Sequence, residues 1–109
     1  MRFHVVTIFP EIFVSYLGES ILGRAIKNKL VSVKFYNPRD FVKASKSNYR
    51  PVDGRPYGGG PGMVMLAEPI LKATKKALSR VKSKKKTKII LFSPAGRKFD
   101  TDYAKKTAK

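Results

Sequence analysis

The chain has 109 residues, enough for one compact domain and too few for two. Its 24 Lys and Arg residues against 7 Asp and Glu give a formal net charge of +17, and hydrophobic residues make up 42%. The lack of cysteine excludes a disulfide scaffold, thiolate catalysis and cysteine-based zinc sites. The apolar opening, residues 3–9, is too short for a signal peptide or a membrane span. We therefore expect one basic, soluble, cytoplasmic domain that does not bind membranes.

The basic residues are concentrated between Glu68 and Asp100, a stretch without any acidic residue. Such a surface favours a polyanionic partner, because each Lys or Arg that neutralises a phosphate adds salt-dependent affinity. RNA or DNA is the favoured partner. A merely solubilising surface is the alternative that charge alone leaves open, and an anionic membrane is much less favoured.

The first half of the chain predicts two strands joined by helices. Residues 3–9 are nearly all apolar or β-branched, which is typical of a strand buried on both faces of a parallel sheet. Pro10 begins a helix that Gly18 ends, and a second short helix covers residues 20–27. Alternation over residues 31–36 predicts the second strand, ended by an Asn-Pro pair. The apolar stripe expected for the first helix is Ile12, Phe13, Tyr16 and Leu17.

The second half begins with a loop over residues 41–62, which shows little periodicity and in which glycines and prolines are concentrated. A long helix is predicted from Pro69 to about residue 81, followed by a lysine-rich loop at 82–86. The inward face expected for this helix is Ile70, Leu71, Thr74, Ala77, Leu78 and Val81.

The last part of the chain predicts one more strand and one more helix. Residues 87–92 are typical of a buried strand and residues 93–96 of a tight turn. Asp100 or Thr101 is expected to cap a final helix. The order of elements predicts an α/β fold, in which helices flank a parallel sheet of three strands.

The strongest functional signal is the glycine- and proline-rich string over residues 55–63. Consecutive glycines let backbone N–H groups approach a ligand and adopt positive φ angles. Tyr57 offers a ring face for a base, and Arg55 offers donors for a phosphate. The string has neither the Lys-Ser/Thr of a phosphate-binding loop nor the spacing of a dinucleotide-binding turn. A ligand-binding loop is favoured over a flexible surface loop.

Other candidate residues carry weaker signals. The turn that starts at Ser93 directly follows a predicted strand, where ligands collect in open α/β sheets, so its backbone is a candidate cofactor contact. Asp53 could act as a base, but Asp-Gly is a turn dipeptide and a structural role is favoured. His4, the sole histidine, fits a core or strand-end position better than a catalytic one. No group of residues has metal-ligand spacing, so no metal is expected.

Taken together, several segments resemble the amino-terminal portion of the bacterial tRNA (guanine-N1)-methyltransferases of the TrmD type, members of the SPOUT class of knotted methyltransferases. They occur in the family's order and spacing across essentially the whole chain. The string at 55–63 is highly specific, whereas the others would be weak alone. The matching segments are residues 8–11, 23–25, 37–41, 52–53, 55–63 and 93–98.

The resemblance implies an enzyme that moves a methyl group from S-adenosylmethionine to N1 of the guanosine 3′ of the anticodon. Family members are homodimers that hold the cofactor in a trefoil knot and bind tRNA across both subunits. The residues that match the cofactor-binding strand end and turn are Leu91, Phe92, Ser93, Pro94 and Gly96. Those that match the loop beside the target guanine are Arg55, Tyr57, Gly58, Gly59, Gly60, Pro61 and Gly62.

The resemblance also implies that important family residues lie beyond Lys109. These are the Gly-Arg-Tyr-Glu-Gly segment that completes the knot, the aspartate proposed as the base with its partner arginine, and the helical tRNA-binding domain. Residues 1–109 are then the amino-terminal part of a SPOUT methyltransferase domain, with no catalytic base of their own. We expect little or no methyl transfer from these residues alone. The alternative is a non-catalytic RNA-binding module, or a split half that works with a partner chain.

Overall fold

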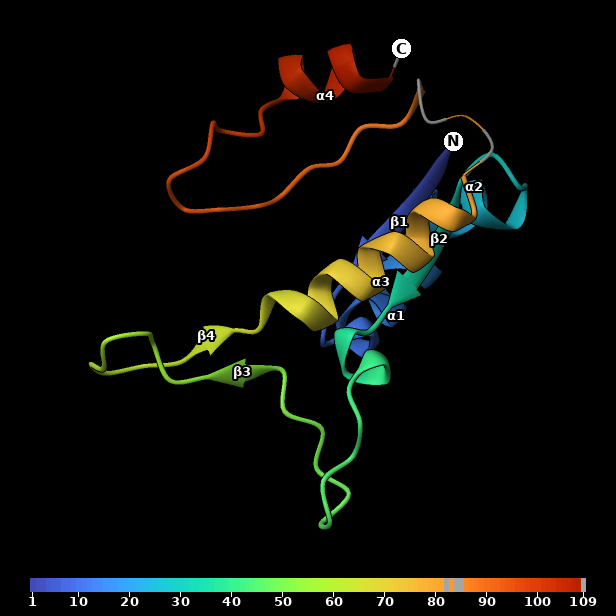
Figure 1. The fold of residues 1–109 in the computed structure, drawn as a ribbon. Coiled ribbons are helices and arrows are strands. Elements are labelled where there is room, and N and C mark those ends of the chain that lie inside the picture. The colour runs from blue at the N-terminus through green and yellow to red at the C-terminus, as the bar shows by residue number, and fades with distance from the viewer. Residues whose placement is uncertain (82, 84–85, 109) are drawn as a thin grey trace.

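A computed structural model describes residues 1–81, 83 and 86–108 of the chain (Figure 1). The predicted loop at 82–86 therefore lies mostly outside the described residues. None of the helices in these ranges is long and apolar enough to cross a membrane. The elements are β1 (Arg2–Val6), the 3-10 helix η1 (Pro10–Phe13), α1 (Val14–Gly18), α2 (Ser20–Lys27), β2 (Ser32–Tyr36), the 3-10 helix η2 (Pro38–Phe41), β3 (Asp53–Gly54), β4 (Val64–Met65), α3 (Ala67–Ser79) and α4 (Thr101–Ala108).

Strands β1 and β2 form a parallel pair in which Phe3 lies opposite Val33 and Val5 opposite Phe35. This confirms the predicted parallel pairing, with η1, α1 and α2 as the crossover. The prediction that the first strand is buried on both faces was wrong. Its first two residues are exposed and the rest half-buried, and the strand ends at Val6. Within the described residues it has one neighbouring strand, which leaves its other edge uncovered.

The sheet lies between α3 on one face and α1 on the other (Figure 1). The ring of Phe13 packs against that of Phe35, with centroids 5.2 Å apart. The predicted apolar stripe of the first helix is only partly correct, because Ile12 is 64% exposed and Tyr16 is 73% exposed. The segment begins as a 3-10 helix with three residues per turn, which rotates the stripe away from the spacing expected of an α-helix.

The corner between α1 and α2 depends on two glycines. Gly18 ends α1, as predicted, and α2 covers the predicted residues 20–27. A Cβ atom on Gly23 would collide with the carbonyl oxygen of Gly18, so this corner requires a residue without a side chain. The second helix can therefore fold back immediately after the first.

The buried core is small and centred on α3. Its fully buried or nearly fully buried residues are Pro38, Val52, Pro69, Ala73 and Ala77. The last three follow one another at intervals of four and form one line along the helix. The predicted inward face missed Pro69 and Ala73 and included Leu71, which is 65% exposed. Small residues at the contact let the helix backbone come close to the sheet and to η2.

The predicted strand at 87–92 was also wrong. In the described residues this segment has no strand partner, and Leu91 and Phe92 are 85% and 77% exposed. Its β-branched and apolar composition suits a sheet, but a strand also needs a neighbour to pair with. Within the described residues the sheet therefore has two parallel strands instead of three, whereas the final helix is confirmed as α4.

Residues 86–108, called the C-terminal arm below, extend away from the α3 layer in Figure 1. The radius of gyration is 16.5 Å, whereas a compact domain of this length would have about 13 Å. The principal axes measure 45 × 31 × 28 Å. The molecule is thus a small α/β layer with two projections, the arm and the β3–β4 hairpin.

We expect Ala73→Leu to destabilise the protein by about 1–3 kcal/mol, because Ala73 is 0% exposed and a larger side chain would push α3 off the sheet. The matched control is Ala67→Leu, which adds the same atoms at the exposed first residue of the same helix. Urea unfolding of the purified protein measures both. Equal stability of the two variants would contradict the close contact of α3.

Candidate cofactor and RNA site

The glycine-rich string forms the tip of the β3–β4 hairpin. The two strands pair antiparallel, Asp53 with Met65 and Gly54 with Val64. Next to this pair, the N–H of Leu66 donates to the carbonyl oxygen of the buried Val52 at 2.7 Å. The base of the hairpin is therefore tied to the core, while its tip projects away from the sheet (Figure 1).

Four glycines of the tip have positive φ angles. These angles are +84° at Gly58, +84° at Gly59, +108° at Gly60 and +91° at Gly62. A Cβ at any of the four would meet no atom within 4 Å, so packing does not explain the glycines. They are explained by the backbone conformation, which other residues adopt only at a cost of about 1–2 kcal/mol each.

The side chains of the tip face solvent. Tyr57 is fully exposed and Arg55 is exposed, as are the glycines and Pro61. An exposed ring and an exposed guanidinium on a backbone of glycines suit a nucleotide, since the ring stacks on a base and the guanidinium binds a phosphate. These residues are thus accessible to a ligand, as a ligand-binding loop requires.

The second candidate segment is the turn in the C-terminal arm. The N–H of Gly96 donates to the carbonyl oxygen of Ser93 at 3.0 Å, and the N–H of Ala95 lies 3.3 Å from the Ser93 hydroxyl oxygen. A Cβ on Gly96 would lie 3.1 Å from the same carbonyl oxygen, so a larger residue would open this turn. The predicted tight turn is confirmed.

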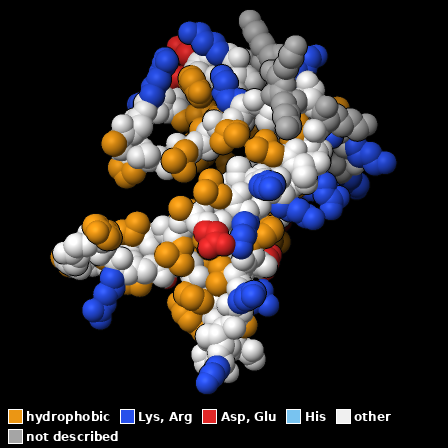
Figure 2. Space-filling view, in the orientation of Figure 1, with side chains coloured by type: hydrophobic (Ala, Val, Ile, Leu, Met, Phe, Trp, Pro, Cys, Tyr) orange, Lys and Arg blue, Asp and Glu red, His pale blue; other side chains and the backbone are white. Residues whose placement is uncertain are grey.

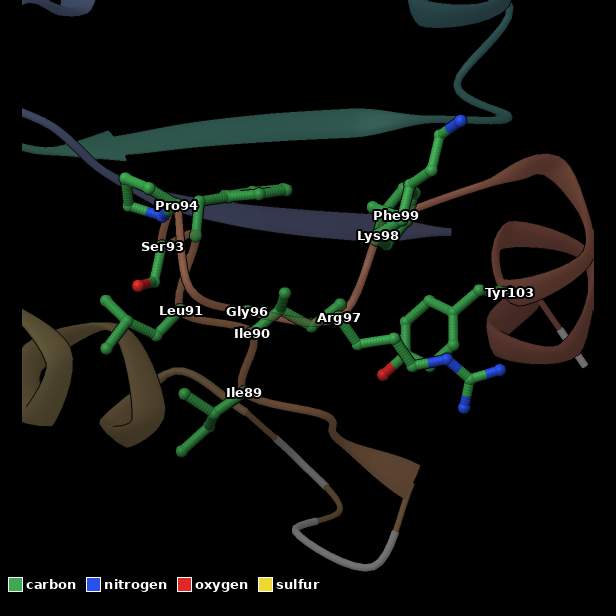
Figure 3. A pocket seen from close by; sticks show the side chains of 11 residues that line it. Ile89, Ile90, Leu91, Ser93, Pro94, Gly96, Arg97, Lys98, Phe99 and Tyr103 are labelled. Atoms are coloured by element: carbon green, nitrogen blue, oxygen red, sulfur yellow. The ribbon is translucent and has the colours of Figure 1, made fainter.

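The turn borders a hollow of about 720 Å³ (Figure 3). Its walls come from the extended segment before the turn, from the turn itself, and from the start of α4. The lining residues are Ile89, Ile90, Leu91, Phe92, Ser93, Pro94, Gly96, Arg97, Lys98, Phe99 and Tyr103. All five predicted cofactor contacts are among them.

Three aromatic side chains hold the hollow together. The Phe92 and Phe99 ring centroids are 5.9 Å apart, and those of Phe99 and Tyr103 are 5.3 Å apart with nearly perpendicular rings. Arg97 lies beside the Tyr103 ring, 5.5 Å from its centroid, as Figure 3 shows. Sequence reasoning missed Phe99 and Tyr103, because Phe99 lies before the predicted cap at Asp100 and no helical spacing relates it to Tyr103.

The start of α4 is fixed by a side-chain cap. The Asp100 carboxylate accepts a hydrogen bond of 2.8 Å from the N–H of Tyr103, and the Asp100 carbonyl accepts one from the N–H of Ala104. Asp100 is therefore the predicted cap, and it sets the position of the Tyr103 ring in the wall of the hollow.

The chemistry of this hollow suits a nucleoside with an anionic tail. Leu91 and Phe92 offer exposed apolar surface to a flat base. The backbone of residues 88–92 makes no hydrogen bond to any other described strand, so its N–H and C=O groups are free to bind a base edge. Arg97 and Lys98 supply positive charge for a carboxylate, and the lining contains no acidic residue.

The structure does not join the two candidate segments into one cavity. No residue of the hairpin tip lines the hollow, and the two belong to separate projections on the same side of the view in Figure 1. His4 and Asp53 occupy structural positions, as expected. His4 Nδ1 lies 2.9 Å from the Tyr36 hydroxyl within the β1–β2 pair, and Asp53 is half-buried in β3.

The fold defines an α/β protein with a parallel sheet, and comparison with known proteins gives its family. The model of the family described as tRNA (Guanine-1)-methyltransferase TrmD matches residues 1–109. The chain belongs to this family.

Individual relatives agree with the family. The tRNA (guanine-N(1)-)-methyltransferase of Ruminiclostridium cellulolyticum is 45% identical over 109 residues, which is 100% of this chain and 45% of that protein. That of Paracidovorax citrulli is 44% identical over 104 residues, covering 94% and 40% of the two chains. The crystal structure of tRNA (m1G37) methyltransferase from Aquifex aeolicus matches with a TM-score of 0.60 at 38% identity, covering 72% of this chain and 34% of that chain. The chain thus spans less than half the length of these relatives.

Replacing Asp100 with Ala should destabilise α4 by about 0.5–2 kcal/mol, because the N–H of Tyr103 loses its acceptor. Amide hydrogen exchange of the α4 backbone measures the effect. Asp102→Ala is the matched control, since it removes the same charge from the first turn of α4. The cap assignment fails if both variants exchange equally fast.

Proposed function

We propose that the chain supplies cofactor- and tRNA-binding elements for methyl transfer from S-adenosylmethionine to N1 of the guanosine 3′ of the anticodon. The observation that carries this is the family match across residues 1–109, which includes both candidate segments. The exposed Tyr57 and Arg55 side chains of the hairpin tip support it, as does the hollow of about 720 Å³ in the arm, which has room for a nucleoside.

The hollow is the proposed site of the methyl donor. Leu91 and Phe92 would cover the adenine, and the backbone of residues 88–92, together with the turn from Ser93 to Gly96, would bind its edge. Arg97 and Lys98 would pair with the carboxylate of the methionine moiety. The donor supplies an electrophilic methyl group, so these residues need only bind and orient it.

The hairpin tip is the proposed site of the target guanosine. Tyr57 would stack on a base, Arg55 would bind a phosphate, and the glycine backbone from Gly58 to Gly62 would let the base come close. Reaction requires N1 about 3–3.5 Å from the methyl carbon. The tip and the hollow must therefore approach one another when both ligands are bound.

We assign no residue of the described chain as the base that removes the N1 proton. Asp53 is the carboxylate nearest the tip in sequence, and it is half-buried in β3. The proposal extends to the class properties implied by the resemblance: a SPOUT domain with a trefoil knot, a homodimer that binds tRNA, and a cytoplasmic location.

A chimera tests whether these binding elements are competent. Residues 1–109 would replace the matching 45% of the Ruminiclostridium cellulolyticum relative. We expect the chimera to transfer labelled methyl to a tRNA transcript with guanosine 3′ of the anticodon and not to one with adenosine there. Tyr57→Ala in the chimera should reduce transfer about tenfold or more, since a base–ring stack is worth about 1–3 kcal/mol.

The control is Tyr16→Ala, which removes a ring that is 73% exposed on α1, and it should change transfer less than twofold. A chimera that binds the transcript but transfers no methyl would contradict the proposal and favour the non-catalytic RNA-binding alternative. If Tyr57→Ala leaves the rate of methyl transfer unchanged, the hairpin tip does not form the guanosine site.

Leu91→Ser in the same chimera should weaken S-adenosylmethionine binding about tenfold, because an apolar contact with the adenine is lost. Leu91 is 85% exposed, so the substitution removes little packing within the protein. Leu71→Ser is the matched control, on a side chain that is 65% exposed in α3. Isothermal titration calorimetry measures both affinities, and equal affinities would show that the cofactor does not use this hollow.

A further inference from the structure

A second hollow lies at the amino-terminal ends of the two parallel strands. Its volume is about 240 Å³, and it is lined by Arg2, Phe3, His4, Ser32, Lys34 and Arg80. Neither the hairpin tip nor the C-terminal arm contributes to it. It is therefore separate from the proposed cofactor and guanosine sites.

The register of the strands brings its polar residues together. Arg2 lies opposite Ser32, and His4 lies opposite Lys34. Since alternate residues of a strand share a face, these four belong to one face of the sheet. Arg80, at the carboxyl end of α3, lines the same hollow. Three cationic residues thus surround one small space.

These cations lack acidic partners. The ion pair that the described residues contain joins Lys72 to Glu68 at 2.7 Å, where the hydrogen bond and the charge of Lys72 lower the pKa of Glu68. Arg2, Lys34 and Arg80 have no carboxylate within 4 Å in the described part of the chain. The partial negative charge at the end of α3 offsets only part of their repulsion. An anion in the hollow would relieve the rest.

We propose that this hollow binds a backbone phosphate of RNA, at a second contact remote from the methyl-transfer site. The inference rests on the proposed function in taking RNA as the partner. Exposed Lys75 and Lys76 on α3 continue the positive surface toward Arg80, and Figure 2 shows Lys and Arg side chains gathered on the side where α2 and the end of α3 lie. A continuous basic track fits a polyanion better than a single free phosphate.

The distance between the hollow and the hairpin end of the sheet sets a minimum size for that RNA. It lies at the amino ends of β1 and β2, whereas η2 and the path to the hairpin leave from the carboxyl end of β2. The strands have five residues each, so the two ends of the sheet are separated by roughly 16 Å. A single nucleotide cannot reach both, and a folded RNA can.

The test compares two double variants of the purified protein that lose the same charge. Lys34→Gln/Arg80→Gln alters two exposed residues of the hollow, and Lys105→Gln/Lys106→Gln alters two exposed lysines of α4, outside it. Affinity for a tRNA transcript is measured from about 50 to 200 mM salt. We expect the first variant to bind about tenfold more weakly at 100 mM, with a salt slope smaller by about 0.7–0.9, because it loses one phosphate contact. The second should change less than twofold.

Each other outcome has a defined meaning. Equal losses in the two variants overturn the proposal, because general charge would then explain binding. Inorganic phosphate that shifts the Lys34 amide resonance, with tRNA affinity unchanged in the variant, also overturns it and marks a site for free phosphate. Methyl transfer by the chimera is a separate measurement. If the chimera transfers no methyl group but the two double variants still differ in tRNA affinity, the proposed function is wrong and this RNA contact is supported.

Discussion

The close approach of α3 to the β1–β2 pair is the contact on which the rest of the structure depends. A two-stranded parallel sheet is marginal by itself, because its faces need cover. Pro69, Ala73 and Ala77 give α3 a line of small side chains, and Pro38 and Val52 fill the adjoining space. Without this contact, neither the hairpin base at Val52 nor the cationic hollow beside Arg80 would have a fixed position.

The two projections differ in how they are supported. The hairpin joins the core through Val52, and glycines with positive φ angles set the shape of its tip. The arm forms its hollow mainly from its own residues, through Phe92, Phe99 and Tyr103 and the cap at Asp100. The tip is thus placed relative to the sheet, whereas the hollow is organised locally. This difference explains why the two candidate segments are each well formed but do not share a cavity.

The sequence predicted correctly where several helices and strands begin or end, because turn and cap residues act on their immediate neighbours. Gly18 ends α1, the Asn-Pro pair follows β2 and Asp100 caps α4, as predicted. The glycine-rich string lies in a loop region, as predicted, and forms an exposed tip. The failures concern tertiary contacts. Residues 87–92 have strand composition, but composition does not supply a pairing partner. Ala73 gives almost no hydrophobic signal, although its small size is what lets α3 pack. The aromatic wall at Phe99 and Tyr103 required knowing that the arm folds on itself.

The placement of charge connects the fold to the proposed RNA partner. A net charge of +17 predicts a polyanionic partner but not where that partner lies. The strand register gathers some of these cationic side chains at one place. It puts Arg2 and Lys34 on one face of the sheet, and α3 brings Arg80 next to them. Such a cluster costs stability unless something neutralises it. If the cluster binds RNA, the same helix that holds the sheet together also positions the RNA. The sheet then separates a phosphate contact at one end from the proposed guanosine site at the hairpin tip beyond the other.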